Sequence, residues 1–177
     1  MKKIFFSIFC LGIGYASGQN QPAPTLKSIL LDQLKTTHNQ QEWFVPVSKS
    51  IAGLSPEQAM WKEGNANHSI GQLVNHLIFW NKENLVKFKG ETPINFNGKN
   101  DETFEANFNK QTWEAAVKQL DSILTEWETA IEKADDVKLQ SWYTTIAHIS
   151  THNAYHTGQI LYIRKQQGSW DADKGVK

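Results

Sequence analysis

Apolar residues recur along most of the chain at intervals of three and four residues, which is the period of a helix with one buried face. The pattern predicts four long helices, at about residues 25–52, 69–89, 112–134 and 144–167. Gly90 and Gly168 directly follow two of these stretches, where glycine commonly ends a helix. No polar and apolar alternation is long enough to predict a strand. We therefore expect an all-α protein.

Two interruptions refine this prediction. Pro46 lies inside the first stretch and should kink or split it, because proline has no amide hydrogen to donate. Residues 91–110 contain Pro93, Gly98 and several asparagines, and they form a connection too long for a tight helical hairpin. A four-helix bundle with one long crossover connection accommodates both features.

Polar residues mark the expected ends of the helices. Ser69 and Gln72 have the spacing of a capping box, in which each side chain bonds a backbone amide of the first turn. Thr112 is expected to cap the third helix, and the pair Asp135-Asp136 to break the pattern after it. The second helix buries Leu73, Leu77 and Trp80 on one face.

The first eighteen residues have the composition of a secretory signal peptide. Lys2 and Lys3 precede the apolar run Ile4–Tyr15, and Ala16-Ser17-Gly18 supplies small residues before Gln19. The run is shorter than the roughly 20 residues that a membrane-spanning helix needs. We expect cleavage between Gly18 and Gln19, export to the periplasm or the medium, and no stable membrane anchor. An uncleaved anchor is the alternative.

The expected organisation has four parts. These are a cleaved signal peptide at 1–18, a linker at 19–24, a helical bundle at 25–168 and a flexible tail at 169–177. Cys10 is the only cysteine and lies in the predicted signal peptide, where the bulky Phe9 before it disfavours lipidation. The mature chain would then have no disulfide and no thiol, so a metal would have to be held by imidazole and oxygen ligands.

Charge indicates no macromolecular partner. The 18 basic and 18 acidic residues balance, and loss of Lys2 and Lys3 leaves 16 basic against 18 acidic, a net charge of about −2. No basic patch of the kind that nucleic acid requires is present. A small-molecule partner is the remaining expectation, and a homodimer formed through helix faces is compatible with the pattern.

The histidines are the candidate chemistry. His148, His152 and His156 follow one another at four-residue spacing, so they lie on one face of a helix, and His76 lies on the apolar face of another. Two imidazoles from the first helix and His76 from the second can converge on one ion in the manner of an open catalytic site. The alternative is a set of core histidines hydrogen-bonded to amides or backbone, and the spacing alone leaves both interpretations open.

Two motifs resemble those of the DinB/YfiT-like superfamily. The stretch Asn67–Leu77 is similar to its second-helix motif, and His152–Ile160 to its last-helix motif, H-x3-H-x-G-Q-I. Leu54–Gln58 is similar to the turn after its first helix. The resemblance covers nearly all of the chain after the predicted signal peptide.

The resemblance implies a four-helix bundle with a three-histidine metal centre. The motif positions fall on His76, His152 and His156 as ligands of a divalent ion, zinc or nickel. Relatives with a known activity are thiol-dependent S-transferases and isomerases. Two departures are His68, which stands where the family often has tryptophan, and the predicted signal peptide, since those relatives work in the cytosol.

Several residues near the predicted site have two possible interpretations each. His148 is the candidate acid or base at the site rim, against ordinary packing, and His68 a capping-region residue, against a fourth ligand. His38 could face the same cavity from the first helix, and Gln159 could bond a ligand imidazole or simply pack. Tyr155 and Trp80 are expected to pack rather than react.

Three hypotheses follow. The first is a metal-dependent enzyme, a hydrolase or a thiol-dependent transferase, whose three neutral ligands leave the charge of the ion uncompensated. The second is a non-catalytic metal- or ligand-binding bundle of the cell envelope, favoured by the missing carboxylate beside the ligands. The third is a metal-free structural bundle.

Overall fold

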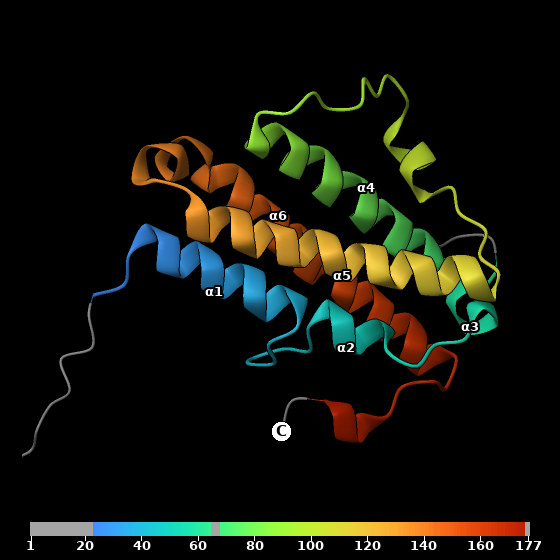
Figure 1. Cartoon of the computed structure of the whole chain (residues 1–177). Helices are drawn as coiled ribbons and strands as arrows, with labels where there is room; N and C mark the ends of the chain where they lie inside the picture. Colours follow the sequence, from blue (N-terminus) through green and yellow to red (C-terminus); the bar gives the residue numbers. More distant parts are fainter. Residues whose placement is uncertain (1–22, 65–67, 176–177) are drawn as a thin grey trace, which may run out of the picture.

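The computed structural model describes residues 23–64 and 68–175. Within these ranges the chain is helical and has no β-strand, which confirms the all-α prediction (Figure 1). The elements are α1 (Leu26–His38), α2 (Val47–Ile51), α3 (Pro56–Met60), α4 (Ile70–Lys89), the 3-10 helix η1 (Asn100–Phe104), α5 (Lys110–Lys133), α6 (Asp136–Gln166) and the 3-10 helix η2 (Ala172–Lys174). The predicted signal peptide lies outside these residues. No helix among those described is long and apolar enough to cross a membrane.

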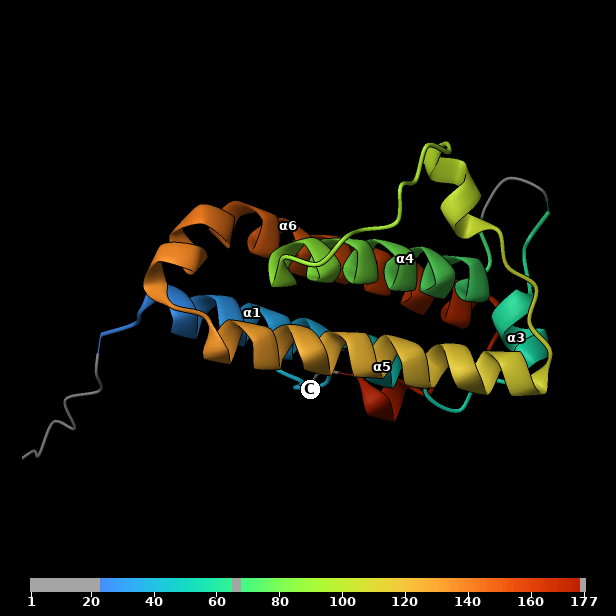
Figure 2. The same ribbon diagram turned by 45° about the horizontal axis from the view of Figure 1, so that its top comes forward.

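The long helices pack side by side around one core. Both α1 and α4 pack against α5 and α6, and η1 lies on α4 (Figures 1 and 2). The core between them is built from large side chains that are almost fully buried: Leu34, Leu77, Leu120, Trp127, Ile131, Leu139, Ile146 and Ile160. The indole Nε1 of Trp127 donates to the backbone oxygen of Asn81 at 3.0 Å, so its one polar atom is satisfied inside the core.

Side-chain caps begin the helices as their sequences suggest. The predicted capping box of Ser69 and Gln72 is present at the start of α4, and Gly90 ends that helix in a left-handed conformation with φ 79°. The prediction for α5 was wrong by one turn. Asn109 is the N-cap, and Thr112 is its reciprocal partner at the third helical position.

The first predicted helix is split, which is one of the two outcomes expected from Pro46. The helix α1 ends at His38, residues 39–46 are not helical, and Pro46 is the N-cap of α2. Two apolar residues of this stretch, Ile29 and Phe44, are exposed, at 48% and 40%. Ile29 lies on the outer face of α1, and Phe44 lies in the non-helical segment, where helical spacing does not decide which side chain is buried.

The last helix starts earlier than its pattern predicts. It begins at Asp136 rather than near Thr144, because the Asp135 side chain accepts from the amide of Lys138 at 2.8 Å and caps a new helix. The aspartate pair therefore starts α6 instead of forming a loop. Val137 and Tyr143 are exposed, at 80% and 49%, and these apolar residues on the outer face obscured the helical period.

A buried arginine ties α6 to α2. The Arg164 side chain is 4% exposed and its Nη1 donates to the backbone oxygens of Ser50 at 2.8 Å and Ala52 at 3.1 Å. Its Nη2 donates to the backbone oxygen of Ser169 at 2.7 Å. Burial lowers the pKa of this guanidinium. Carbonyls at the end of α2, which have no partner within the helix, are thereby satisfied.

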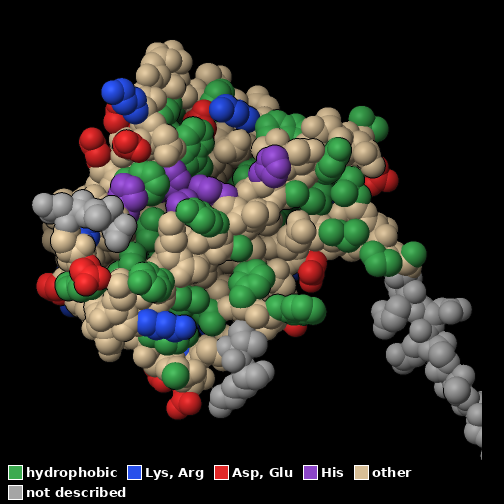
Figure 3. Space-filling view, turned by 180° about the vertical axis from the view of Figure 1, so that it is seen from behind, with side chains coloured by type: hydrophobic (Ala, Val, Ile, Leu, Met, Phe, Trp, Pro, Cys, Tyr) green, Lys and Arg blue, Asp and Glu red, His purple; other side chains and the backbone are tan. Residues whose placement is uncertain are grey.

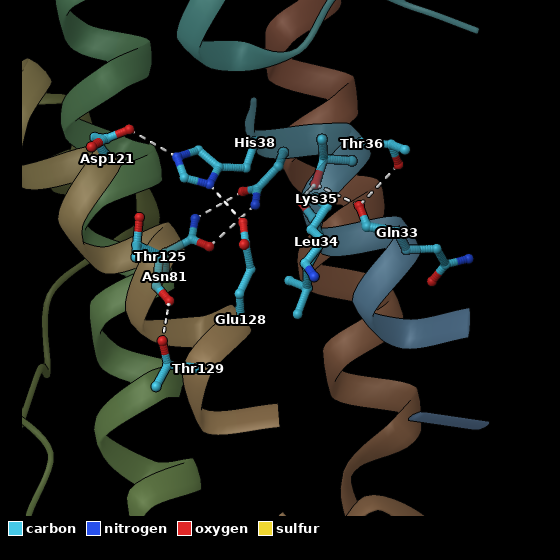
Figure 4. A network of polar contacts seen from close by, with 12 residues as sticks. Gln33, Leu34, Lys35, Thr36, His38, Asn81, Asp121, Thr125, Glu128 and Thr129 are labelled. Atoms are coloured by element: carbon cyan, nitrogen blue, oxygen red, sulfur yellow. Dashed lines mark hydrogen bonds and ion pairs between the residues drawn. The ribbon is translucent and has the colours of Figure 1, made fainter. Parts of the chain in front are cut away.

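His38 joins α1 to α5 and does not face the cavity of the other histidines. Its ring is 1% exposed, and it lies between two carboxylates of α5 (Figure 4). The Nδ1 atom is 2.7 Å from Glu128 and the Nε2 atom is 3.0 Å from Asp121. Each contact needs a ring N–H, because a carboxylate only accepts. The ring therefore bridges α1 to two carboxylates of α5.

Substitution of His38 by alanine should lower the free energy of unfolding by about 3 kcal/mol, because it leaves the Glu128 carboxylate, 16% exposed, without its hydrogen-bond donor. Urea unfolding followed by circular dichroism measures the change. Asp121→Asn is the control, since the Asp121 side chain is 63% exposed and its pair should contribute less than about 1 kcal/mol. Equal losses in the two variants would contradict this account.

Candidate metal centre

Three imidazoles from two helices converge on one point. His76 comes from α4, and His152 and His156 lie one turn apart on α6. The Nε2 atom of His152 is 3.0 Å from the Nε2 atom of His76 and 3.0 Å from that of His156. All three ligand atoms lie within 4.8 Å of one another. Nitrogens held about 2.1 Å from one tetrahedral ion lie roughly 3.4 Å apart, so the spacing fits a single metal.

Hydrogen bonds on the far side of two rings settle which nitrogen carries the proton. The Thr103 hydroxyl donates to the backbone oxygen of Asn100 at 2.6 Å and can therefore accept from the Nδ1–H of His76, also at 2.6 Å. The Gln159 carbonyl oxygen accepts from the Nδ1–H of His156 at 2.7 Å. Both Nε2 atoms consequently turn lone pairs toward the centre. Such partners orient metal-ligating histidines and raise their basicity as ligands.

Burial keeps the imidazoles neutral. It lowers the pKa of His76 to about 3, with further contributions from His156 and His152. Burial, followed by the neighbouring His156, lowers the pKa of His152 to about 4. Burial also lowers the pKa of His156, although the hydrogen bond that its Nδ1–H donates to Gln159 opposes the shift. A metal competes with protons for these nitrogens, so a site that disfavours protonation is ready to take up an ion near neutral pH.

The centre opens into a cavity of about 590 Å³, which we call the metal cavity. Its volume lies in the range of small-molecule sites, roughly 300–1,000 Å³. The described residues that line it include no Asp, Glu, Lys or Arg; they are His76, Trp80, Asn81, Asn84, Asn100, Phe104, Thr145, His148, Ile149, His152, Tyr155 and His156. Figure 3 shows histidine side chains gathered on this side of the molecule among hydrophobic ones.

The remaining histidines take different places. His148 is exposed and lines the metal cavity, as expected of a residue at the rim. His68 lies outside the three-ligand group, and its ring stacks on Phe104 at 3.9 Å between centroids. The opposite neighbour of Phe104 is His76, stacked at 3.8 Å. The Phe104 ring thus separates an exposed histidine from a buried one.

Three other candidate residues are at the site. Trp80 is only half-buried, lines the metal cavity, and donates from its indole Nε1 to the side chain of Asn100 at 3.2 Å. Gln159 was predicted either to bond a ligand imidazole or to pack, and it forms the hydrogen bond, to His156. Tyr155 packs edge-on against His156, with 5.0 Å between ring centroids.

A buried amide pair holds α4 and α6 in register next to the imidazoles. The Asn81 side chain donates to Asn153 at 2.8 Å and accepts from it at 3.2 Å, and both residues are 1% exposed (Figure 4 shows Asn81). Asn81 also donates to the backbone oxygen of Leu77 at 2.8 Å. Sequence reasoning missed this pair, although a polar residue on each apolar stripe was a readable signal. Thr103 and Phe104 were also missed, because the short 3-10 helix η1 that holds them has no comparable signal.

A comparison with protein families assigns the chain to a superfamily. The family model described as the DinB superfamily matches residues 47–160, well over half of the chain, and the chain belongs to that superfamily, which is metal-binding. The match runs from α2 into α6 and contains all three imidazoles, while α1 precedes it. Comparison with curated proteins and with solved structures found no significant match.

Thr103→Val should weaken binding of zinc or nickel by about 10- to 100-fold, because it removes the acceptor that holds the Nδ1–H of His76. Competition with a chromophoric chelator measures the affinity. Thr157→Val is the matched control, since Thr157 is also buried, at 2% exposed, but its hydroxyl bonds only the backbone oxygen of Asn153. Unchanged affinity in Thr103→Val would show that the hydroxyl does not position the ligand.

The metal-free protein should lose stability as the pH falls from 6.5 toward about 4. In that window the unfolded chain protonates its histidines at the ordinary pKa of 6.5, whereas folded His152 and His76 stay neutral down to about 4 and about 3. The unfolded state then binds more protons, which favours unfolding. Melting temperatures in chelator at each pH test this. His152→Gln should give a shallower slope, and an unchanged slope would contradict the assignment.

Proposed function

We propose that this chain is a metalloenzyme that holds one divalent transition-metal ion, zinc or nickel, on His76, His152 and His156. Its substrate would be a small molecule bound in the metal cavity. The observation that carries the proposal is the convergence of Nε2 lone pairs, held by Thr103 and Gln159 behind two of the rings, at the wall of a cavity of about 590 Å³. A purely structural group of histidines would not need an opening to a cavity.

The helices around the site support the bundle that the sequence predicts. Each of α1 and α4 packs against both α5 and α6, as in a four-helix bundle, and residues 90–109 between α4 and α5 would be its long crossover. In such bundles metal sites are built from side chains on facing helices. The ligands on α4 and α6 follow that rule.

A divalent ion on three neutral ligands supplies Lewis acidity and lowers the pKa of a protic group that it binds. The protein's own residues would do the rest. Phe104 and Trp80 line the cavity with aromatic surface and limit the access of water, and Asn84 and Asn100 offer amides that can orient a polar substrate. The absence of charged side chains among the described lining residues leaves the charge of the ion as the dominant field in the cavity.

His148 is the proton acceptor we propose for the reaction. It is the one imidazole that lines the metal cavity without belonging to the three-ligand group. It lies one turn before His152 on α6 and is exposed, so it can exchange protons with solvent. This arrangement suits hydrolysis or the activation of a thiol for transfer, in which His148 would take the proton of the attacking group.

A non-catalytic role is the second candidate, and one observation favours it. Hydrolytic metal sites commonly place a carboxylate beside the ion as a base, and the described lining of the metal cavity has none. The chain would then bind and retain a metal or a small ligand. We also propose that the protein is exported, on the strength of Lys2, Lys3 and the apolar run Ile4–Tyr15.

The chain without residues 1–18 should contain about one metal ion per molecule after incubation with zinc or nickel, since its donor set can complete one site. A His152→Ala/His156→Ala double variant should contain none. Elemental mass spectrometry after gel filtration measures the content. His148→Ala is the control and should keep the full content, because His148 is not a ligand. No metal in the wild type would refute the proposal.

Catalysis is tested on the same loaded proteins with ester, amide and thiol-transfer substrates. An enzyme predicts turnover in the wild type and a loss of roughly 100-fold or more in His148→Ala at unchanged metal content. A binding module predicts no turnover and recovery of an unchanged ligand. Turnover unaffected by His148→Ala would remove His148 from the mechanism and leave the metal centre in place.

A further inference from the structure

A second cavity, of about 400 Å³, lies beside the metal cavity and has no role in the function proposed above. We call it the aromatic cavity. It is formed between the segment after α3 and the exposed face of α6, and Tyr155 lines both cavities. None of the three converging imidazoles is among the residues that line it. A ligand held here would therefore not need a metal.

Aromatic side chains form its walls. Trp61 lies on one side, and Tyr155 and Tyr162 lie seven residues apart on α6. Seven residues make two helical turns, so the two tyrosines emerge from the same face roughly 10 Å apart. They are 63% and 62% exposed, so a large part of their ring surface is available to a ligand. Flat rings stack favourably against such surfaces, beyond the gain from burial alone.

Gly158 keeps the floor between the two tyrosines open. A Cβ atom built on Gly158 meets nothing within 4 Å, and the residue has no unusual backbone conformation. Glycine inside a helix costs about 1 kcal/mol relative to alanine. Its presence here is unfavourable for the helix and leaves room for a ring that would lie directly on the backbone of α6.

Polar groups at the cavity favour an acceptor, and in particular an anion. The Gln159 carbonyl oxygen is used by His156, so the end of this amide that can serve a ligand is its NH₂. Lys62 adds an ammonium group to the lining. The one carboxylate of the lining, Glu63, accepts a hydrogen bond from the Gln166 side chain at 2.9 Å.

We propose that the aromatic cavity binds a flat aromatic carboxylate, with the ring between Tyr155, Tyr162 and Trp61 and the carboxylate near Gln159 and Lys62. The cavity of about 400 Å³ has room for a fused two-ring system, and the charge of the lysine matches the anionic end. The binding goes beyond the proposed metalloenzyme and does not rest on it.

The test is isothermal titration calorimetry of the chain without residues 1–18 with 2-naphthoate. We expect saturable binding of one molecule per chain. Gly158→Leu fills the open floor and should weaken binding by about tenfold or more. Gly158→Ala is the matched control and should bind like the wild type, because its Cβ fits the open space. Both replacements have a higher helix propensity than glycine, so the fold should tolerate them.

Three results would overturn the proposal. These are no saturable binding at millimolar concentrations, equal binding by Gly158→Leu and the wild type, and loss of binding in the His152→Ala/His156→Ala variant, which would place the ligand on the metal centre. Equal affinity for 2-naphthalenemethanol would refute the anionic end. The two proposals can fail independently. Gly158→Leu should keep one metal ion per chain, so a failure of ligand binding in the aromatic cavity would not affect the proposed metal centre. Likewise, a protein that takes up no metal but binds 2-naphthoate would refute the metal centre and leave the aromatic cavity supported.

Discussion

The register of α4 against α6 is the constraint on which the site depends. One ligand candidate lies on α4 and two lie on α6, so a slide of either helix by a single turn, about 5.4 Å, would separate nitrogens that now lie 3.0 Å apart. Apolar packing alone specifies such a register poorly, since similar side chains can interdigitate in neighbouring positions. The reciprocal amides of Asn81 and Asn153 are satisfied in one register only.

Burial of the three imidazoles forms the site, and it also costs free energy unless each ring nitrogen has a hydrogen-bond or metal partner. Imidazoles withdrawn from water lose hydration that must be replaced, and the structure replaces it on one edge of His76 and of His156 by a hydroxyl and an amide. The inner edges face one another. Such an arrangement stabilises the folded chain least at low pH and most when a cation binds. The same ring nitrogens therefore determine both the stability of the chain and its capacity to bind metal.

The helical class, the start of α4 and the three converging histidines could be predicted from sequence, and each for a physical reason. Apolar spacing reports which face is buried, Ser69 and Gln72 satisfy the first amides of α4, and histidines four residues apart share a face. The start of α6 could not be predicted, because an aspartate pair can break one helix or cap the next, and only the neighbouring geometry decides. Thr103 lay beyond prediction for a different reason: its contact with His76 spans 27 positions, and the non-helical residues 90–99 within that span have no pattern that fixes the path of the chain.

The contact of Thr103 with His76 has a consequence for how the connection between α4 and α5 can vary among relatives. Most of such a segment tolerates insertion and substitution, since few of its residues are buried. The short helix η1 is different, because Thr103 holds one ligand candidate and Phe104 stacks on its ring. Lengthening the chain before Asn100 would leave the centre intact, whereas one residue inserted between Asn100 and Phe104 would rotate both side chains away. The tolerance of the connection between α4 and α5 to insertion should therefore change at η1.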